Sequence, residues 1–177
     1  FQAVTPRTAG FNTIDLAGMQ NSSKLLTTVL MFIGGSPAST AGGIKVSTLA
    51  VLILAVRTLI TGKEDVYAFK RKISYSSVNK ALAVLFVGLT VIISGTMILS
   101  LTEPSKEFLY VLFETVSAFG TVGLSLGITG ELSVLGRLVV IVIMFTGRVG
   151  ALTILLALAT KENKVLYKFP EDKVIVG

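Results

Sequence analysis

One apolar run constrains the fold more than any other feature of this sequence. Residues 81 to 101, ALAVLFVGLTVIISGTMILSL, contain no charged side chain. About 20 apolar residues, at about 1.5 Å of helix rise each, cross a hydrocarbon core of about 30 Å. A helix of this length in a soluble core would have a polar face, and this run has almost none. The run therefore predicts a membrane-spanning helix in an all-α membrane protein.

The composition agrees with a membrane protein and excludes several kinds of site. Of the 177 residues, 52% are hydrophobic and 15% are charged, whereas soluble domains carry about 25% charged residues. The absence of cysteine and histidine excludes disulfides, thiolate metal sites and histidine bases. The formal net charge is +6. Most basic residues lie beside apolar spans, so we expect them to anchor cytoplasmic segments and not to bind nucleic acid.

The charge bias also predicts a topology. The basic segments 63–72 and 161–173 should be cytoplasmic. The span 81–101 then leads outward and the span 134–159 returns inward. Between them, residues 108–119 are apolar but too few to cross the membrane. Because both flanks of this segment are external, it should be a re-entrant helix followed by a loop that climbs back out. Non-helical backbone at that depth must be buried in protein or line a watery cavity.

An internal repeat relates the two ends of the chain. A shift of 113 residues aligns the two glycine-rich loops and the apolar segments that follow them. The matched pairs include Thr8 with Thr121, Gly10 with Gly123, Met31-Phe32 with Met144-Phe145, and Gly34 with Gly147. The repeat predicts tandem units of spanning helix, re-entrant helix, loop and spanning helix. The first unit lacks its first spanning helix and most of its re-entrant helix.

The two glycine-rich loops predict a cation filter. The sequence TVGLS, residues 121 to 125, is close to the TVGYG signature of potassium-channel filters, and Thr-Ala-Gly occurs one unit earlier. A filter must aim several backbone carbonyls at a dehydrated cation, and glycine permits the necessary φ values. The C-terminal end of a re-entrant helix also favours a cation. The predicted potassium-binding residues are Thr8, Ala9, Gly10, Phe11, Thr121, Val122, Gly123 and Leu124.

The motifs TAGFNT, FGTVGLS and GGSPASTAGGIKVST together resemble the Ktr/Trk/HKT superfamily of potassium transporters. The resemblance covers essentially the whole chain, as the C-terminal half of such a subunit. It implies four tandem units around one pore, with one filter glycine per loop at Gly10 and Gly123. This chain would then hold the third filter loop onward and the complete fourth unit.

The resemblance implies the following organisation. Residues 1–62 would end the third unit, with a filter loop at 8–13 and a broken helix at 22–61. Residues 63–77 would form a cytoplasmic linker, and residues 161–177 a cytoplasmic tail. The fourth unit would occupy residues 78–160, with a helix at 78–101, a pore helix at 107–119, a filter at 120–126 and a helix at 133–160.

The stretch GGSPASTAGGIKVST, residues 34 to 48, interrupts an apolar span. Four glycines and a proline exceed what a helix kink requires. The resemblance implies that residues 34–43 form an intramembrane gating loop under the filter, with Arg148 facing the pore from the last span. Arg148 is the only charge between Arg137 and Lys161, and an arginine at that depth calls for a pore or a partner. We expect it to act in the pore, to pair with backbone carbonyls of the gate, or to do both. The implied gate residues are Gly34, Gly35, Ser36, Pro37, Ala38, Ser39, Thr40, Ala41, Gly42, Gly43, Lys45 and Arg148.

The resemblance further implies a potassium-translocating, multi-pass homodimer in the bacterial cytoplasmic membrane. A cytosolic, KtrA-like ring of nucleotide-binding regulatory subunits would dock on it, and the chain itself would carry no organic cofactor. A sodium or other monovalent-cation transporter of the same superfamily is the alternative. A phosphate-binding loop is disfavoured because Ile44 separates Gly43 from Lys45. An enzyme is disfavoured because no paired or metal-binding cluster occurs in the spans. Glu114 either holds the filter loop by accepting backbone N–H bonds or faces external water.

Overall fold

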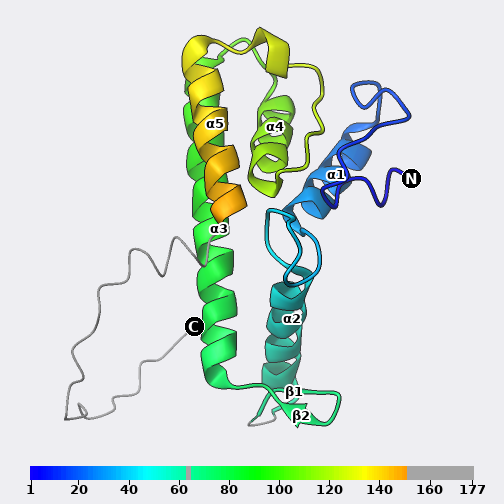
Figure 1. Cartoon of the computed structure of the whole chain (residues 1–177), viewed down its shortest axis with the longest axis vertical. Helices are drawn as coiled ribbons and strands as arrows, with labels where there is room; N and C mark the ends of the chain where they lie inside the picture. The colour runs from blue at the N-terminus through cyan, green and yellow to red at the C-terminus, as the bar shows by residue number, and fades with distance from the viewer. Residues whose placement is uncertain (63–64, 151–177) are drawn as a thin grey trace, which may run out of the picture.

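The computed structural model describes residues 1–62 and 65–150. The described chain is mainly helical and carries one small β-hairpin (Figure 1). Its elements are α1 (Asn21–Phe32), α2 (Val46–Ile60), β1 (Tyr67–Ala68), β2 (Arg71–Lys72), α3 (Tyr75–Thr102), α4 (Phe108–Gly120), a 3-10 turn (Thr129–Glu131) and α5 (Val134–Val149).

α3 is the long axis of the molecule. It has 28 residues, and within the described ranges it is the one helix long and apolar enough to cross a membrane. Ser74 starts it by accepting a hydrogen bond from the backbone N–H of Ser77. α5 runs back alongside the upper part of α3, and α2 lies beside its lower part (Figure 1). The predicted continuation of α5 to residue 160 and the tail 161–177 fall outside the described residues.

α4 is a short helix buried between α1, α3 and α5. Every residue from Phe113 to Gly120 is buried. α4 begins near the C-terminal end of α3 and stops about halfway along it, where a Cβ on Gly88 would lie 3.3 Å from the Phe119 ring. Residues 121–128 then return toward the end of α3 from which α4 started (Figure 1). The chain therefore starts α4 and ends this loop near the same end of α3 (Figure 1).

The break between α1 and α2 is longer than predicted. It runs from residue 33 to residue 45 and not from 34 to 43, because backbone bonds between its two ends extend the non-helical region. Ile33 and Ile44 form an isolated β-bridge, and Lys45 is extended with φ −67° and ψ 147°. We call residues 33–45 the break loop.

The predicted linker 63–77 includes two short strands, so the fold is not strictly all-α. It contains the hairpin β1–β2, in which Tyr67 pairs with Lys72 and Ala68 with Arg71. Two left-handed residues, Phe69 (φ 47°) and Lys70 (φ 64°), make the two-residue turn that this kind of hairpin needs. α3 also begins inside the predicted linker, at Tyr75, because Ser74 supplies the cap.

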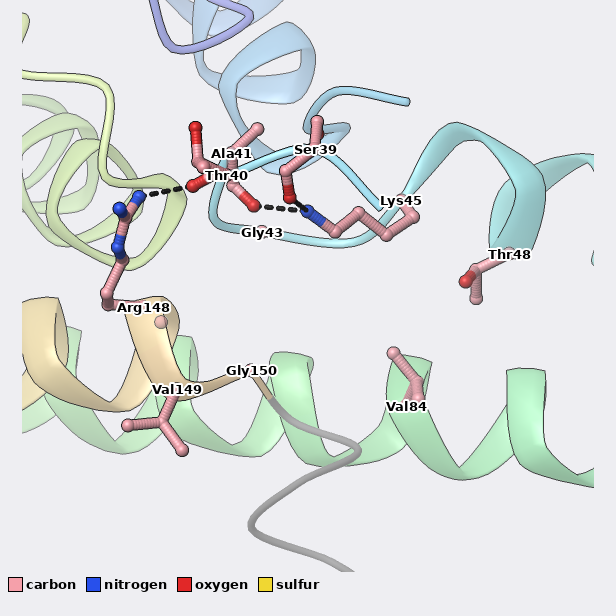
Figure 2. A pocket seen from close by; sticks show the side chains of 11 residues that line it. Ser39, Thr40, Ala41, Gly43, Lys45, Thr48, Val84, Arg148, Val149 and Gly150 are labelled. Carbon is pink, nitrogen blue, oxygen red and sulfur yellow. Dashed lines mark hydrogen bonds between the residues drawn. The ribbon is translucent and has the colours of Figure 1, made fainter. Parts of the chain in front are cut away.

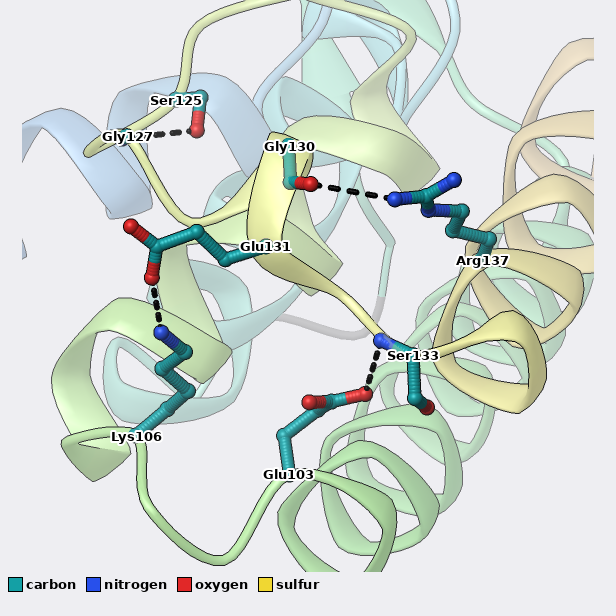
Figure 3. Close-up of polar contacts among 8 residues, drawn as sticks. All are labelled: Glu103, Lys106, Ser125, Gly127, Gly130, Glu131, Ser133 and Arg137. Carbon is teal, nitrogen blue, oxygen red and sulfur yellow. Dashed lines mark hydrogen bonds and ion pairs between the residues drawn. The ribbon is translucent and has the colours of Figure 1, made fainter.

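Polar contacts tie the end of α3 to the start of α5 (Figure 3). Glu103 is 7% exposed, and its carboxylate accepts the backbone N–H of Ser133 at 2.8 Å. Arg137 donates to the Gly130 carbonyl at 3.1 Å, and Lys106 pairs with Glu131. These bonds fix the loops on either side of α4, so they set where α4 enters.

Glu103 predicts a pH dependence of stability. The hydroxyl and backbone N–H of Ser133 hold the pKa of Glu103 below its usual value. A lowered folded-state pKa adds stability above the unfolded pKa, about 4.3 for glutamate, and this stability is lost as the pH falls through the folded value. Purified full-length Glu103→Gln should therefore have a lower Tm than wild type at pH 7. The gap should narrow as the pH falls through the folded pKa of Glu103, whereas a gap of constant size would contradict the assignment.

Gly147 of α5 predicts a steric constraint on α4. A Cβ at this position would overlap the carbonyl oxygen of Phe119. Gly147→Ala should destabilise the protein by about 1–3 kcal/mol, measured by denaturation of the purified full-length protein. The matched control is Gly130→Ala, where a Cβ meets no described atom within 4 Å. The control should stay within about 0.5 kcal/mol of wild type, and equal effects of the two variants would refute the close contact.

Candidate functional site

The two glycine-rich loops contact each other directly. We call residues 8–13 the first glycine loop and residues 120–126 the second. A Cβ on Gly10 would overlap the carbonyl oxygen of Val122 and lie 3.9 Å from the Cα of Gly123. Segments more than a hundred residues apart in the chain are therefore brought together backbone to backbone. A side chain at Gly10 would separate them.

Both glycine loops share one backbone pattern. In the first, Thr8 and Gly10 have φ of 70° and 75°; in the second, Thr121 and Gly123 have φ of 51° and 89°. These are the positions that the sequence repeat aligns. Alternating left-handed residues turn successive carbonyls toward one side, whereas a regular strand sends them to opposite sides. A left-handed β-branched residue such as threonine costs about 1–3 kcal/mol and occurs mainly where function requires it.

The second glycine loop starts at the C-terminal end of α4. The last carbonyls of a helix lack partners within the helix and carry partial negative charge. Gly120 ends α4 in a crowded place, since a Cβ there would lie 2.7 Å from the carbonyl oxygen of Met31 in α1. The negative end of α4 is thus presented beside the loop pair, which favours a cation there.

The two glycine loops are supported differently. In the first, the buried hydroxyl of Thr5 donates to the carbonyl of Phe11. In the second, the carboxylate of Glu114 accepts hydrogen bonds from the hydroxyls of Ser125 and Thr129. Glu114 is 6% exposed, so it does not face external water. The expectation that it accepts backbone N–H bonds is also wrong, because its partners are side chains.

The break loop is closed at its neck by backbone hydrogen bonds. The N–H of Gly34 donates to the carbonyl of Ile44 at 2.8 Å, and the N–H of Ile44 donates to the carbonyl of Phe32 at 3.0 Å. The N–H of Val46 donates to Gly35 at 3.2 Å. A Cβ on Gly34 would overlap the carbonyl oxygen of Gly42. The neck therefore joins α1 to α2 firmly, and the rest of the loop projects from it.

The break loop lies against the second glycine loop. The N–H of Gly42 donates to the hydroxyl of Thr121 at 3.1 Å. A Cβ on Gly42 would be 2.6 Å from that hydroxyl and 2.7 Å from the carbonyl oxygen of Gly120. Nothing larger than glycine fits between the break loop and the end of α4. The predicted gate and the predicted filter are thus in direct contact.

Two cationic side chains hold the carbonyls of the break loop (Figure 2). Lys45 donates to the carbonyl of Ser39 at 3.0 Å and to that of Ala41. Arg148 reaches across from α5 to the carbonyl of Thr40. Three consecutive carbonyls therefore accept hydrogen bonds from one cationic side chain of the loop and one of a neighbouring helix. The residues that carry these carbonyls line a cavity of about 470 Å³, which is also lined by Thr48 and Val84.

Not all predicted site residues take part in these contacts. Ser36, Pro37 and Ala38 are exposed in the break loop, where Ala38 has φ 62°. The side chain of Phe11 is 72% exposed, although its carbonyl accepts the Thr5 hydroxyl. Sequence reasoning assigned no site role to Thr129, Met31 or Val84, and it placed Ser125 in the filter segment without its contact to Glu114. The two hydroxyl residues Ser125 and Thr129, four apart, were a usable signal, whereas apolar Val84 carried none.

Comparisons with known proteins identify the family of the chain. Residues 1–167 match the TrkH family, described as cation transport protein. Over its whole length the chain is 45% identical to Ktr system potassium uptake protein B of Bacillus subtilis and 45% identical to that of Vibrio alginolyticus. It is 42% identical to potassium/sodium uptake protein NtpJ of Enterococcus hirae. The chain spans 39%, 38% and 40% of the lengths of these three relatives.

The fold is similar to that of a solved transporter. The potassium transporter TrkH from Vibrio parahaemolyticus matches with a TM-score of 0.74 at 23% identity. The match covers 88% of this chain and 35% of that one. The helical fold is therefore similar to that of this transporter. Since the family match extends over residues 1–167, the chain belongs to the TrkH family of cation transport proteins, and over its full length it resembles the membrane subunit of a Ktr system.

Proposed function

We propose that the full-length protein translocates potassium across the bacterial cytoplasmic membrane, with the two glycine loops forming part of a carbonyl filter. One observation carries the proposal. Thr8 and Gly10 share left-handed φ values with Thr121 and Gly123, and the two loops touch at Gly10 and Val122. Sequence repetition and backbone geometry coincide at these positions. Two units of a pore built from tandem repeats would produce this coincidence.

The position of α4 supports a pore at membrane depth. α4 stops beside the middle of α3, near Gly88, and α3 is long enough to cross the bilayer. The loop that follows α4 would then lie inside the hydrocarbon layer. Irregular backbone at this depth is tolerated where protein buries it or where it lines a water-filled path. A filter of carbonyls lining the pore meets this requirement.

A filter of this kind separates cations by the cost of replacing their water shells. Carbonyls held at fixed positions replace the shell of potassium well and that of smaller sodium poorly. Glycine at position 10 and position 123 favours potassium, and the relatives include two potassium uptake proteins. A potassium and sodium uptake protein is almost as similar. Passage of sodium or another monovalent cation is therefore the second candidate function.

The break loop acts as the gate in this proposal. It lies against Thr121 of the filter, and its carbonyls are tied by Lys45 and Arg148. Lys45 belongs to the break loop and moves with it, whereas Arg148 belongs to α5. Opening therefore breaks the bonds of Arg148 to Thr40 and of Gly42 to Thr121. A homodimer and a cytosolic ring of nucleotide-binding regulatory subunits, which would trigger this movement, complete the proposal.

The filter is tested by replacing Gly123 with serine. Its φ of 89° is strained for any L-residue, although a Cβ there meets no described atom within 4 Å. Gly123→Ser in the full-length protein should lower the preference for potassium over sodium by about tenfold, corresponding to about 1.4 kcal/mol. The readout is uptake of each ion by a transport-deficient cell.

Gly62 supplies the matched control for this experiment. It has a φ of 63° and the same open surroundings, but it lies after α2 and outside both glycine loops. Gly62→Ser carries similar backbone strain and should leave the ion preference unchanged. An unchanged preference in Gly123→Ser, or equal changes in both variants, would sink the filter assignment.

The gate is tested by shortening the break loop. Deleting residues 36–41 retains Gly42 and the hydrogen-bonded neck, and it removes the carbonyls held by Lys45 and Arg148. This variant should raise potassium flux in the absence of regulatory subunits. Arg148→Gln should raise it less, because Lys45 still holds Ser39 and Ala41. Ser36→Ala, at an exposed position of the loop, is the control. Flux equal to wild type in the deletion variant would refute the gate.

A further inference from the structure

Glu114 is a buried carboxylate that the proposed filter and gate do not use. It lies in the middle of α4, two turns before the second glycine loop, and it is 6% exposed. Burying a carboxylate is costly unless hydrogen bonds compensate. The hydrogen-bond partners of Glu114 must therefore compensate for the cost of burying its carboxylate.

Both carboxylate oxygens of Glu114 are bound by the chain that leaves the second glycine loop. The hydroxyl of Ser125 lies 2.8 Å from Oε2, and that of Thr129 lies 2.5 Å from Oε1. The two hydroxyl oxygens are 2.8 Å apart, and Ser125 Oγ also accepts the N–H of Gly127 at 3.0 Å. Hydrogen bonds to a carboxylate are about twice as strong as neutral ones. Glu114 thus holds the C-terminal end of the segment that begins at Thr121.

The backbone at Gly123 is open on one side, although its neighbours Val122 and Leu124 are buried. A cavity of about 250 Å³ is bordered by Glu114, by residues 121–125 and by Val140 and Met144 of α5. A Cβ on Gly123 would meet no described atom within 4 Å. The position of Gly123 therefore depends on the packing of its two neighbours and on the ends of the segment, one of which is held by Glu114.

The first glycine loop has no such carboxylate. The repeat shift places Phe1 at the position of Glu114 and Asn12 at that of Ser125. The support there is the hydroxyl of Thr5, which donates to Phe11. The carboxylate is thus specific to the second loop and is not a general requirement of the repeat. This difference points to a local role in positioning Gly123.

We propose that Glu114 is a positioning residue of the second glycine loop, and that its bonds to Ser125 and Thr129 determine how strictly this loop distinguishes potassium from sodium. The inference rests on the proposed filter. A loop held at its far end keeps its carbonyls too far apart for the smaller ion, and a released loop can close around it. Loss of Glu114 therefore lowers discrimination and still permits flux.

The test uses the full-length protein and measures potassium and sodium uptake in competition, normalised to the amount of protein in the membrane. Glu114→Ala should lower the preference for potassium by about tenfold, as expected for the loss of two hydrogen bonds to a charged group. Glu114→Gln keeps the length and one acceptor oxygen and should retain most of the preference. Glu131→Gln, an exposed carboxylate nearby on the same connection, should behave as wild type.

Three results would overturn the proposal. One is an unchanged preference in Glu114→Ala. Another is an equal loss in Glu114→Gln and Glu114→Ala, which would assign the effect to charge and not to position. The third is an unchanged preference in the double variant Ser125→Ala, Thr129→Val. This variant removes both hydrogen-bond donors, so the proposal requires it to lose preference for potassium as Glu114→Ala does. This double variant also carries the test if Glu114→Ala does not accumulate in the membrane.

Failure of this inference differs from failure of the filter itself. If only the role of Glu114 is wrong, Gly123→Ser still lowers the preference for potassium while Glu114→Ala does not. If the filter is wrong, Gly123→Ser has no effect either.

Discussion

The C-terminal end of α4 is where backbone meets backbone, and the rest of the structure depends on this contact. Gly147 of α5 lies against the carbonyl of Phe119, and Gly42 of the break loop lies against that of Gly120. Met31 of α1 presents its own carbonyl to Gly120. Helix-end carbonyls need partners or a cation, most of all within a membrane. Small residues around this end let three segments approach, and the same crowding holds the second glycine loop in place.

This contact explains why the proposed gate and filter are adjacent. Thr121 has a left-handed φ of 51° and receives the N–H of Gly42. Movement of the break loop removes that bond from the first residue of the second glycine loop. Any change in gate position therefore alters the constraint on the filter, and ions bound in the filter influence the gate to the same degree by linkage. The hydrogen bond between Gly42 and Thr121 is the physical link between the two.

The sequence predicted those elements that local composition determines. The charge-free run became α3, and the short apolar segment 108–119 became α4. The repeat anticipated equal backbone geometry at Gly10 and Gly123. The neck of the break loop could not be predicted, because Gly34 and Ile44 pair through backbone atoms that no side-chain pattern encodes.

The partners of the charged residues were only partly predictable. Arg148 was expected to face the pore or to pair with backbone carbonyls of the gate, and it does donate to the carbonyl of Thr40. Which carbonyl it reaches depends on the path of the break loop. The hydroxyl partners of Glu114 follow from the path of the loop after Gly123, and tertiary structure sets that path. Composition and periodicity thus identify the helices and candidate residues, and three-dimensional contacts assign their roles.

The central claim of the proposed function is that a cation binds to backbone carbonyls of the two glycine loops. Anomalous diffraction from crystals of the full-length protein in rubidium, a potassium analogue, tests it most directly. The account predicts rubidium density bordered by the backbone carbonyls of residues 8–11 and 121–124. Rubidium found only elsewhere, for example in the cavity beside Arg148, would contradict it.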